Sequence, residues 1–212
     1  MGSASFVIGE WNSIVQSHSA FHRFFQSTLA RLDGEMIAKC NADWSPLTFN
    51  PEQPFGSNGH WGRTTILPAL FDDHSGSQMA HWRQRFTTAG NQTLMAGTRS
   101  GNTIPEDFKI AWAGIAFPNK NQHISEIKWQ IGDRKYGRID IEEMLGYNQP
   151  AIIFQDGYLI NEEEAFDLYG YVEGPLATDL SGLVLGWQRI VLLGYAAYRQ
   201  IDRVLGQCGA AI

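Results

Sequence analysis

Alternating apolar and polar residues predict several β-strands in this chain. Within residues 123–131, Ile127, Trp129 and Ile131 alternate with polar residues, which is typical of an antiparallel strand with one buried face. Residues 108–117 form a longer apolar run that contains Gly114, and a glycine at such a place often marks a bulge or the close approach of another backbone. Roughly eight such segments, separated by turn signals, predict a mostly β protein built as an antiparallel β-sandwich, and a jelly roll in particular.

Residues 151–199 carry the strongest strand signals, and we expect the rest of the chain to cover them. Asp156 and Gly157 separate two apolar runs, which is the pattern of a tight β-hairpin. An aromatic-rich run at 165–173 follows, and then the longest apolar run of the chain at 183–198. The last run contains two polar residues and is too short to span a bilayer, so we interpret it as a buried strand or strand pair.

Residues 11–32 show the spacing of an amphipathic helix, with apolar positions three and four residues apart. Gly34 follows the pattern at a place where a glycine commonly caps the C-terminal end of a helix. We therefore predict one long N-terminal helix, which packs on the β-structure or, alternatively, docks on a neighbouring subunit. Its predicted apolar stripe consists of Trp11, Ile14, Val15, His18, Phe21, Phe25, Leu29 and Leu32, and Phe24 lies beside it.

Residues 41–63 are rich in proline and glycine and also carry Trp44, Phe49, Phe55 and Trp61. A long connection inside a compact domain tends to be functional or interfacial. We expect an extended aromatic segment that is pressed against protein, either its own chain or a neighbour. The predicted organisation is one globular domain with an N-terminal helical arm at 1–40, the aromatic segment at 41–63 and the β-sandwich at 64–212.

The composition is that of a globular protein with few charges. Hydrophobic residues make up 43% of the chain and charged residues 18%, so a sizeable core is expected. The net charge of −6 and the lack of a basic arm argue against direct nucleic-acid binding. The acidic run at 140–173 is interpreted as a solvated face, or as a surface that complements a basic patch on another copy. Cys40 and Cys208 are expected to be free thiols, although a single bridge between them stays open.

No secretory signal or membrane span is found at the N-terminus or elsewhere, so we expect synthesis in the cytoplasm. Two groups of residues have types that bind metals, but neither has the spacing of a known site. We interpret these histidines as packing or surface residues and the aspartates as turn-forming residues, and we expect no bound metal. The two groups are His18 with His22, and Asp72 and Asp73 with His74 and His81.

No nucleotide-binding, hydrolase or metalloprotease motif is present, so we expect neither an enzyme nor a cofactor. Glu162, Glu163 and Glu164 could supply one carboxylate of a glycosidase pair. They follow a predicted hairpin, where acidic residues more often protect an exposed edge from strand addition. A hydrolase is therefore the weakest of the hypotheses.

A self-assembling structural subunit, such as a single-jelly-roll viral coat protein, is the leading functional hypothesis. Many aromatic residues and few charges suit repeated contacts between copies, and other copies of the chain are the expected partners, with other shell proteins as further candidates. The expected location is a virion or an assembled shell. The candidate interface residues are Phe24, Trp44, Phe49, Phe55 and Trp61.

A carbohydrate-binding module is the alternative hypothesis, because flat aromatic side chains stack on sugar rings and sandwich folds often form lectins. The aromatic residues that could form such a surface are Trp44, Trp61, Trp82 and Tyr147.

Overall fold

A computed structural model describes residues 5–51, 59–119, 122–141, 149–174 and 186–199, and its strands form antiparallel sheets apart from one short parallel pair. The first sheet has the order β1 (Phe6–Glu10), β11 (Pro150–Ile160), β7 (Phe108–Ala116), β14 (Val191–Tyr198), β3 (His60–Thr65) and β2 (Thr48–Phe49). The second sheet has the order β10 (Ile139–Asp140), β8 (Ile124–Ile131), β12 (Phe166–Val172), β6 (Gly90–Gly97) and β4 (Phe71–Asp73), and β9 (Arg134–Lys135) also pairs with β8.

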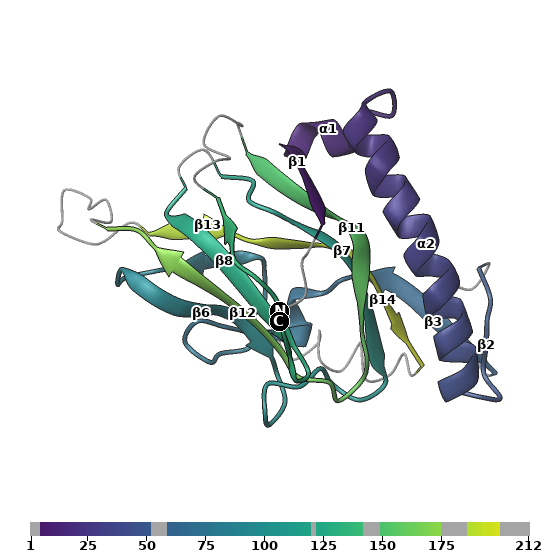
Figure 1. Ribbon diagram of the computed structural model, residues 1–212. Coiled ribbons are helices and arrows are strands. Elements are labelled where there is room, and N and C mark those ends of the chain that lie inside the picture. Colours follow the sequence, from purple (N-terminus) through teal and green to yellow (C-terminus); the bar gives the residue numbers. More distant parts are fainter. Residues whose placement is uncertain (1–4, 52–58, 120–121, 142–148, 175–185, 200–212) are drawn as a thin grey trace.

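Three further elements complete the described chain. Strands β5 (Arg83–Arg85) and β13 (Trp187–Arg189) form a two-stranded ribbon, and a 3-10 turn covers Pro68–Leu70. Helix α1 (Trp11–Val15) is short, and helix α2 (Ala20–Asp43) runs along the first sheet on the side away from β8, β12 and β6 (Figure 1). The prediction of a mostly β protein with antiparallel sheets is confirmed.

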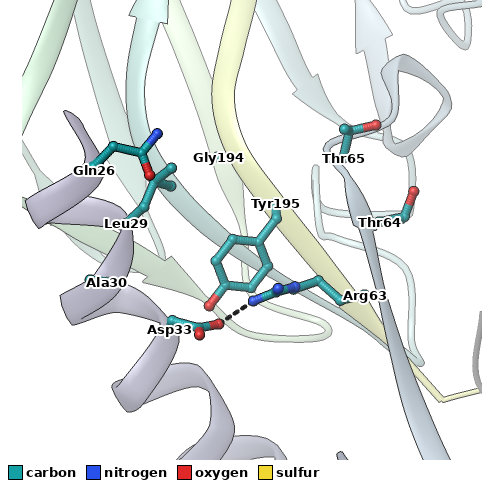
Figure 2. A pocket seen from close by; sticks show the side chains of 9 residues that line it. All are labelled: Gln26, Leu29, Ala30, Asp33, Arg63, Thr64, Thr65, Gly194 and Tyr195. Atoms are coloured by element: carbon teal, nitrogen blue, oxygen red, sulfur yellow. Dashed lines mark hydrogen bonds and ion pairs between the residues drawn. The ribbon is translucent and has the colours of Figure 1, made fainter. Parts of the chain in front are cut away.

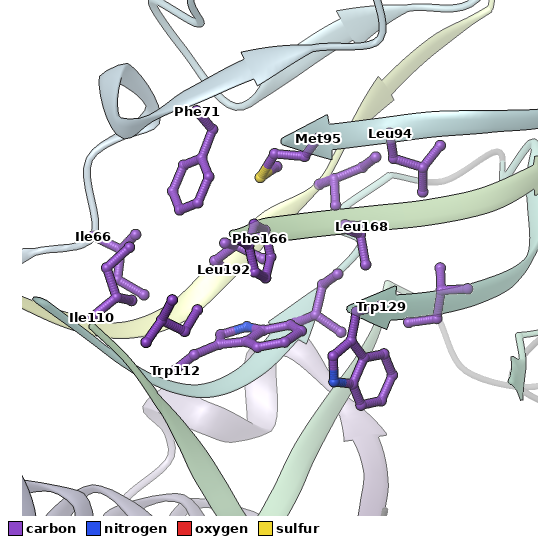
Figure 3. Packing of buried hydrophobic residues seen from close by; sticks show 14 of the residues in the cluster. Ile66, Phe71, Leu94, Met95, Ile110, Trp112, Trp129, Phe166, Leu168 and Leu192 are labelled. Atoms are coloured by element: carbon purple, nitrogen blue, oxygen red, sulfur yellow. The ribbon is translucent and has the colours of Figure 1, made fainter. Parts of the chain in front are cut away.

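The main core lies between the two sheets. Side chains from β4, β6, β8 and β12 point toward side chains from β7 and β14, as Figure 3 shows. Trp112 lies near its middle, with its ring centroid 5.5 Å from that of Trp129 and 5.4 Å from that of Phe166, both edge-on. Such edge-to-face pairs contribute about 0.5–1.5 kcal/mol each beyond the area that they bury.

Helix α2 buries the opposite face of the first sheet. Leu32, Met36 and Cys40 pack there against Ala111 and Ala113 of β7. The small alanines let the helix approach the sheet closely, while bulky residues of the same strand fill the core on the other side. Every residue of β7 is consequently buried, which explains why its sequence is almost continuously apolar instead of alternating.

The prediction of a single helix over 11–32 is correct in its start at Trp11 but wrong in two respects, because the helix is interrupted after Val15 and the second helix continues to Asp43. A break after α1 leads to Ser19, whose side-chain oxygen accepts a hydrogen bond of 2.9 Å from the backbone N–H of His22 and caps α2. Gly34 does not end the helix, because Met36 and Cys40 continue its buried stripe. Gly34 itself lies on the solvent side, where nothing is within 4 Å of a Cβ built on it. A glycine on the solvent side lowers helix stability but does not stop a helix that is held by packing.

The hairpin predicted at Asp156 and Gly157 is also wrong, because β11 continues through these residues. From Ile153 to Tyr158 β11 advances five residues while its partner β7 advances two, from Gly114 to Trp112, so β11 bulges outward. Gly157 does have the positive φ that the sequence suggested, at 61°. A glycine in the left-handed region serves a bulge as well as a turn, which is why the pattern misled.

Other segments agree with the sequence. Ile127, Trp129 and Ile131 of β8 are buried, as the alternation predicted. Gly114 permits close approach, since a Cβ there would lie 2.2 Å from the carbonyl oxygen of Ile152 on β11. Region 41–63 begins with the end of α2 and includes β2 and the start of β3, so its described part packs on its own chain. The region predicted as a helical arm also contributes a strand, β1, to the first sheet.

The bulge generates a first prediction, that Gly157→Val lowers the free energy of unfolding by about 1–3 kcal/mol or more. A Cβ at this position would lie 2.6 Å from Cδ1 of Leu32, in addition to the unfavourable φ. Gly34→Ala is the matched control, because its Cβ meets open space, and it should raise helix stability slightly. Denaturant unfolding measures both, and equal stability of wild type and Gly157→Val would contradict the bulge.

Candidate functional site

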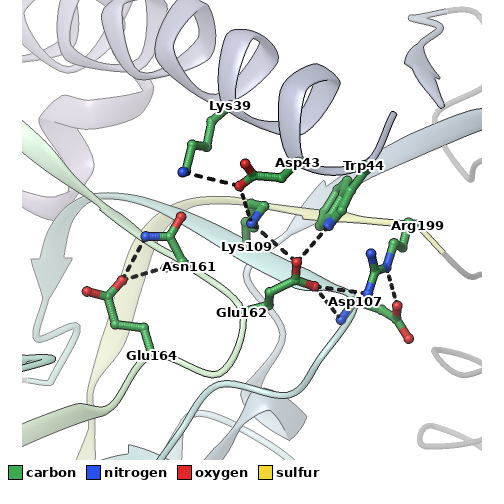
Figure 4. Close-up of polar contacts among 9 residues, drawn as sticks. All are labelled: Lys39, Asp43, Trp44, Asp107, Lys109, Asn161, Glu162, Glu164 and Arg199. Atoms are coloured by element: carbon green, nitrogen blue, oxygen red, sulfur yellow. Dashed lines mark hydrogen bonds and ion pairs between the residues drawn. The ribbon is translucent and has the colours of Figure 1, made fainter. Parts of the chain in front are cut away.

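The most unusual buried group in the described chain is the ammonium group of Lys109. It lies on the helix-facing side of β7, and its side chain is only 3% exposed. Its Nζ is 3.0 Å from Oδ2 of Asp43, at the end of α2, and 3.5 Å from Oε1 of Glu162, just after β11. The ring of Trp44 lies 5.2 Å away (Figure 4), so two carboxylates and an aromatic ring face one cation.

Glu162 extends this cluster to the start of β7 and to the end of β14. Its Oε1 accepts a hydrogen bond of 3.0 Å from the indole N–H of Trp44, and its Oε2 accepts one of 3.0 Å from the backbone N–H of Asp107. Arg199, after β14, lies 3.3 Å from Oε2 of Glu162 and also pairs with the Asp107 carboxylate. The cluster therefore connects the end of α2 with the ends of β7, β11 and β14.

The charges in this cluster balance, and this indicates a structural role. Three cations (Lys39, Lys109 and Arg199) face three carboxylates (Asp43, Asp107 and Glu162). The hydrogen bond from Lys109 holds the pKa of Asp43 below its ordinary value of 3.8, so this carboxylate stays ionised. Lys109 and Glu162 line none of the five principal cavities of the described residues. The described charges of the cluster are thus paired with one another.

A cavity of about 430 Å³ lies between α2 and the strands β3 and β14. Figure 2 shows Asp33 and Arg63 joined by an ion pair across it, with the ring of Tyr195 beside them. The Arg63 guanidinium lies 5.0 Å from the centre of that ring, and burial raises the pKa of the Tyr195 hydroxyl well above its usual range. The charged pair neutralises itself and the phenol stays protonated, so this cavity holds no activated nucleophile or base.

The first group of possible metal-binding residues, His18 and His22, lies around the start of α2. His18 lies before α2, and Nδ1 of His22 is within hydrogen-bond distance of the carbonyl oxygen of Ile14. No group of three or more His, Cys, Asp or Glu side chains has a metal-binding arrangement in the part of the chain that the structure describes.

The second predicted group, around Asp73, forms a turn. Oδ1 of Asp73 accepts hydrogen bonds from the backbone N–H groups of Ser75 and Ser77, at 2.8 and 3.1 Å. The ring of His74 packs on Phe86, with centroids 4.7 Å apart, while His81 is exposed and Asp72 belongs to β4. The interpretation of Asp73 as a turn-forming residue is confirmed.

The three neighbouring glutamates have different environments. Glu164 accepts hydrogen bonds from the backbone and side-chain nitrogens of Asn161, and Glu163 is exposed with a positive φ of 59°. Glu162 points instead into the charge cluster, where the sequence expected an exposed edge. Its partners Lys109 and Arg199 are distant in sequence, so only the fold reveals this role. The one hint in the sequence was the position of Lys109 within the apolar run of β7, where every residue is buried.

The candidate interface residues lie mostly inside the chain. Trp44 is 2% exposed and Trp61 is 1% exposed, and Phe49 stacks on Trp61 with ring centroids 4.6 Å apart. Phe24 is half-buried and packs against a cluster that includes Ile14 of α1 and Ile153 of the first sheet. Phe55 lies outside the described residues. Trp44 and Trp61 therefore pack within their own chain, and they present no surface to a second copy or to a sugar.

The remaining aromatic and cysteine candidates add little surface. Trp82 is exposed at an intermediate level and packs against the main core, while Tyr147 and Cys208 lie outside the described residues. Cys40 is fully buried beneath α2, and burial raises the pKa of its thiol to about 12. A thiol in this state is a poor nucleophile.

The exposed apolar surface lies elsewhere. Among the described residues, the large hydrophobic side chains that remain exposed are Phe6, Val7, Val15, Tyr171 and Trp187. The first three belong to the N-terminal segment, and Val15 is 75% exposed. Phe6 and Val7 lie on β1, the edge strand of the first sheet. Residues 6–15 thus carry three of the five exposed large hydrophobic side chains of the described residues.

The charge cluster generates a second prediction, that Lys109→Met destabilises the protein by about 3–5 kcal/mol, because two carboxylates lose their buried cation. Lys39→Met is the matched control, since Lys39 contacts the same Asp43 at 3.3 Å but is 47% exposed, and it should cost about 0–1 kcal/mol. Denaturant unfolding distinguishes them. Equal losses in the two variants would contradict a central role for Lys109.

The pKa of Asp43 generates a third prediction, on acid stability. A folded-state pKa below the unfolded value contributes stability above the unfolded pKa, and this contribution is lost as pH falls toward the folded value. Below about pH 4 the wild type should therefore lose stability with a steeper slope than Asp43→Asn. Unfolding free energies between neutral and strongly acidic pH measure the slope, and parallel curves would contradict the assignment.

Comparisons with protein-family models, with curated proteins and with solved structures found no match to this chain. No helix in the described part of the chain combines the length and the apolar character needed to cross a membrane.

Proposed function

We propose that this chain is a self-assembling structural subunit with a single jelly roll, of the kind that forms viral shells. The observation that carries the proposal is the pairing of eight strands, taken in chain order as β3, β6, β7, β8, β10, β11, β12 and β14. The first pairs with the eighth, the second with the seventh, the third with the sixth and the fourth with the fifth, all antiparallel.

This nested pairing is what results when one long antiparallel ribbon is wrapped into two facing sheets. Two further antiparallel pairings, of β14 with β7 and of β12 with β8, join these pairs into the strand orders β3-β14-β7-β11 and β6-β12-β8-β10. The shared core between them fits a β-sandwich. Jelly rolls of this kind occur in viral capsid proteins, lectins and cupins. The fold therefore supports a shell subunit equally with a lectin or a cupin, and the exposed residues must distinguish between them.

The surface that favours assembly is the N-terminal segment of residues 6–15. β1 occupies the edge of the first sheet, so its outer backbone groups can pair with a strand of another copy. Phe6 and Val7 point to opposite faces of this edge and are 37% and 40% exposed, so a contact there would bury apolar surface on both sides. Strand addition between identical edges gives a twofold contact, one of several that a closed shell needs.

The partners proposed are other copies of this chain and, in a mixed shell, other shell proteins. Direct binding to a genome is not part of the proposal, because the chain has a net charge of −6. We further propose that the chain is made in the cytoplasm and resides in a virion or an assembled shell.

A carbohydrate-binding module remains the alternative, and one cavity favours it. This cavity of about 650 Å³ beside β8 is lined by Lys128, Gln130, Tyr136 and Tyr169 among others. Tyr136 stacks on Trp129 at 5.7 Å and Lys128 lies over Tyr169 at 5.7 Å, so each ring already has a partner on one face. Less ring surface is then left for a sugar, and we rank this function second.

The assembly proposal makes a fourth prediction. The purified protein should form oligomers that grow with concentration or salt, because salt screens repulsion between acidic faces and strengthens apolar contacts. The double variant Val7→Glu/Val15→Glu should lower the oligomer mass measured by light scattering without changing the far-UV circular dichroism. Tyr171→Glu is the control, since Tyr171 is similarly exposed at 38% but lies on β12 of the second sheet.

Electron microscopy supplies the deciding observation, because closed shells, sheets or tubes distinguish a structural subunit from a dimeric enzyme or lectin. A protein that stays monomeric at every salt and protein concentration and binds to a glycan array would overturn the proposal in favour of the carbohydrate-binding module.

A further inference from the structure

The ribbon of β5 and β13 concentrates positive charge in a protein that is negatively charged overall. Arg83 lies directly opposite Arg189 in the strand register, and Trp187 lies opposite Arg85. Gln84 and Gln188 are buried between them, so the arginines and the tryptophan share the other face of the ribbon. Like charges directly opposite in a sheet repel each other, so this arrangement costs stability in the free protein. A bound anion would remove that cost.

The ribbon is held firmly by the rest of the fold. The side-chain nitrogen of Gln84 donates a hydrogen bond of 2.8 Å to the carbonyl oxygen of Leu94 on β6. The backbone N–H of Phe86 donates one of 2.8 Å to Gly186, and that of Ile190 donates one of 3.0 Å to Trp82. Both ends of the ribbon are therefore fixed, and the arginines start from a rigid base.

A cavity of about 360 Å³ opens beside this face. Its polar lining includes Arg83, Gln188 and Arg189 from the ribbon, Asn119 after β7 and Gln149 before β11, and none of the described residues that line it is a carboxylate. Nδ2 of Asn119 is buried and makes no hydrogen bond to the described residues. Two guanidinium groups at one cavity are complementary to an acceptor that carries negative charge, and no carboxylate among the described lining residues neutralises them there.

Trp187 adds a flat apolar surface to this cavity. The Arg83 guanidinium lies 4.2 Å from the centre of the indole ring, yet Trp187 remains 41% exposed. The cation–π contact orients the guanidinium, whose planar fork suits two oxygens of one oxyanion. The exposed remainder of the indole can contact the uncharged part of a ligand.

We propose that the cavity beside the β5–β13 ribbon binds the oxyanion group of a small organic ligand. Arg83 and Arg189 bind the phosphate, sulfate or carboxylate, and Trp187 packs against the attached ring. A phosphorylated nucleoside and an acidic sugar share this chemistry, and the experiment distinguishes them. The site does not depend on the proposed assembly, because the ribbon and β1 belong to different sheets.

Isothermal titration of the full chain tests the site with four probes at constant ionic strength: inorganic phosphate, inorganic sulfate, adenosine monophosphate and glucuronic acid. At least one should bind where chloride does not. Arg83→Gln and Arg189→Gln should each weaken that binding about tenfold or more, since each removes charge-assisted hydrogen bonds. Arg134→Gln, an exposed arginine on β9, is the matched control and should leave the affinity unchanged.

Further variants identify the ligand class and protect the test from misfolding. Trp187→Ala should weaken binding of the ring-bearing probe and leave inorganic phosphate or sulfate unaffected, and the preference between the nucleotide and the sugar names the source. If Arg83→Gln fails to fold by circular dichroism, Arg189→Lys replaces it and should give an intermediate affinity. Binding of no probe above chloride, or equal affinities in wild type, Arg189→Gln and Arg134→Gln, would overturn the proposal.

Discussion

Strand β7 is buried on both faces, and the rest of the structure adapts to that burial. One face carries Trp112 and other bulky residues into the core between the sheets, while the other carries Ala111 and Ala113 toward α2. Gly114 is required because the Ile152 carbonyl occupies the place of a side chain. Lys109 is the exception to this apolar strand, and its charge can stay buried only because α2 and β11 end beside it with the carboxylates of Asp43 and Glu162.

The sequence predicted the elements whose burial is simple, and it missed those whose shape depends on distant partners. Strand β8 has one buried face, so its alternation was sufficient. Gly157 has the φ of a turn, but whether β11 turns or bulges depends on pairing with β1 and β7 and on contact with Leu32. The length of α2 likewise follows from packing on the sheet, which continues past Gly34. The partners of Glu162 come from three other elements, and no local pattern could reveal them.

The placement of the aromatic residues changes where a contact surface can be. The sequence suggested that Trp44 and Trp61 would contact a partner. The first sheet, however, supports two hydrophobic layers, one between the sheets and one beneath α2, and these residues fill the second layer. This second hydrophobic layer therefore buries Trp44 and Trp61, and Phe49 packs against it. Apolar contact between copies then depends on the few side chains that the layers leave uncovered, above all those of β1 and the end of α1.

The two proposed surfaces differ in the physical force that each uses, and this makes them separable. Contact through β1 would combine backbone hydrogen bonds with apolar burial, which added salt strengthens. Binding at Arg83 and Arg189 would rest on charge attraction at an accessible cavity, which added salt weakens. An anion held by the ribbon would also reduce the local positive charge and leave the protein more negative. Occupancy of that site would then oppose association of copies at low ionic strength, and this coupling should vanish once screening removes their mutual repulsion.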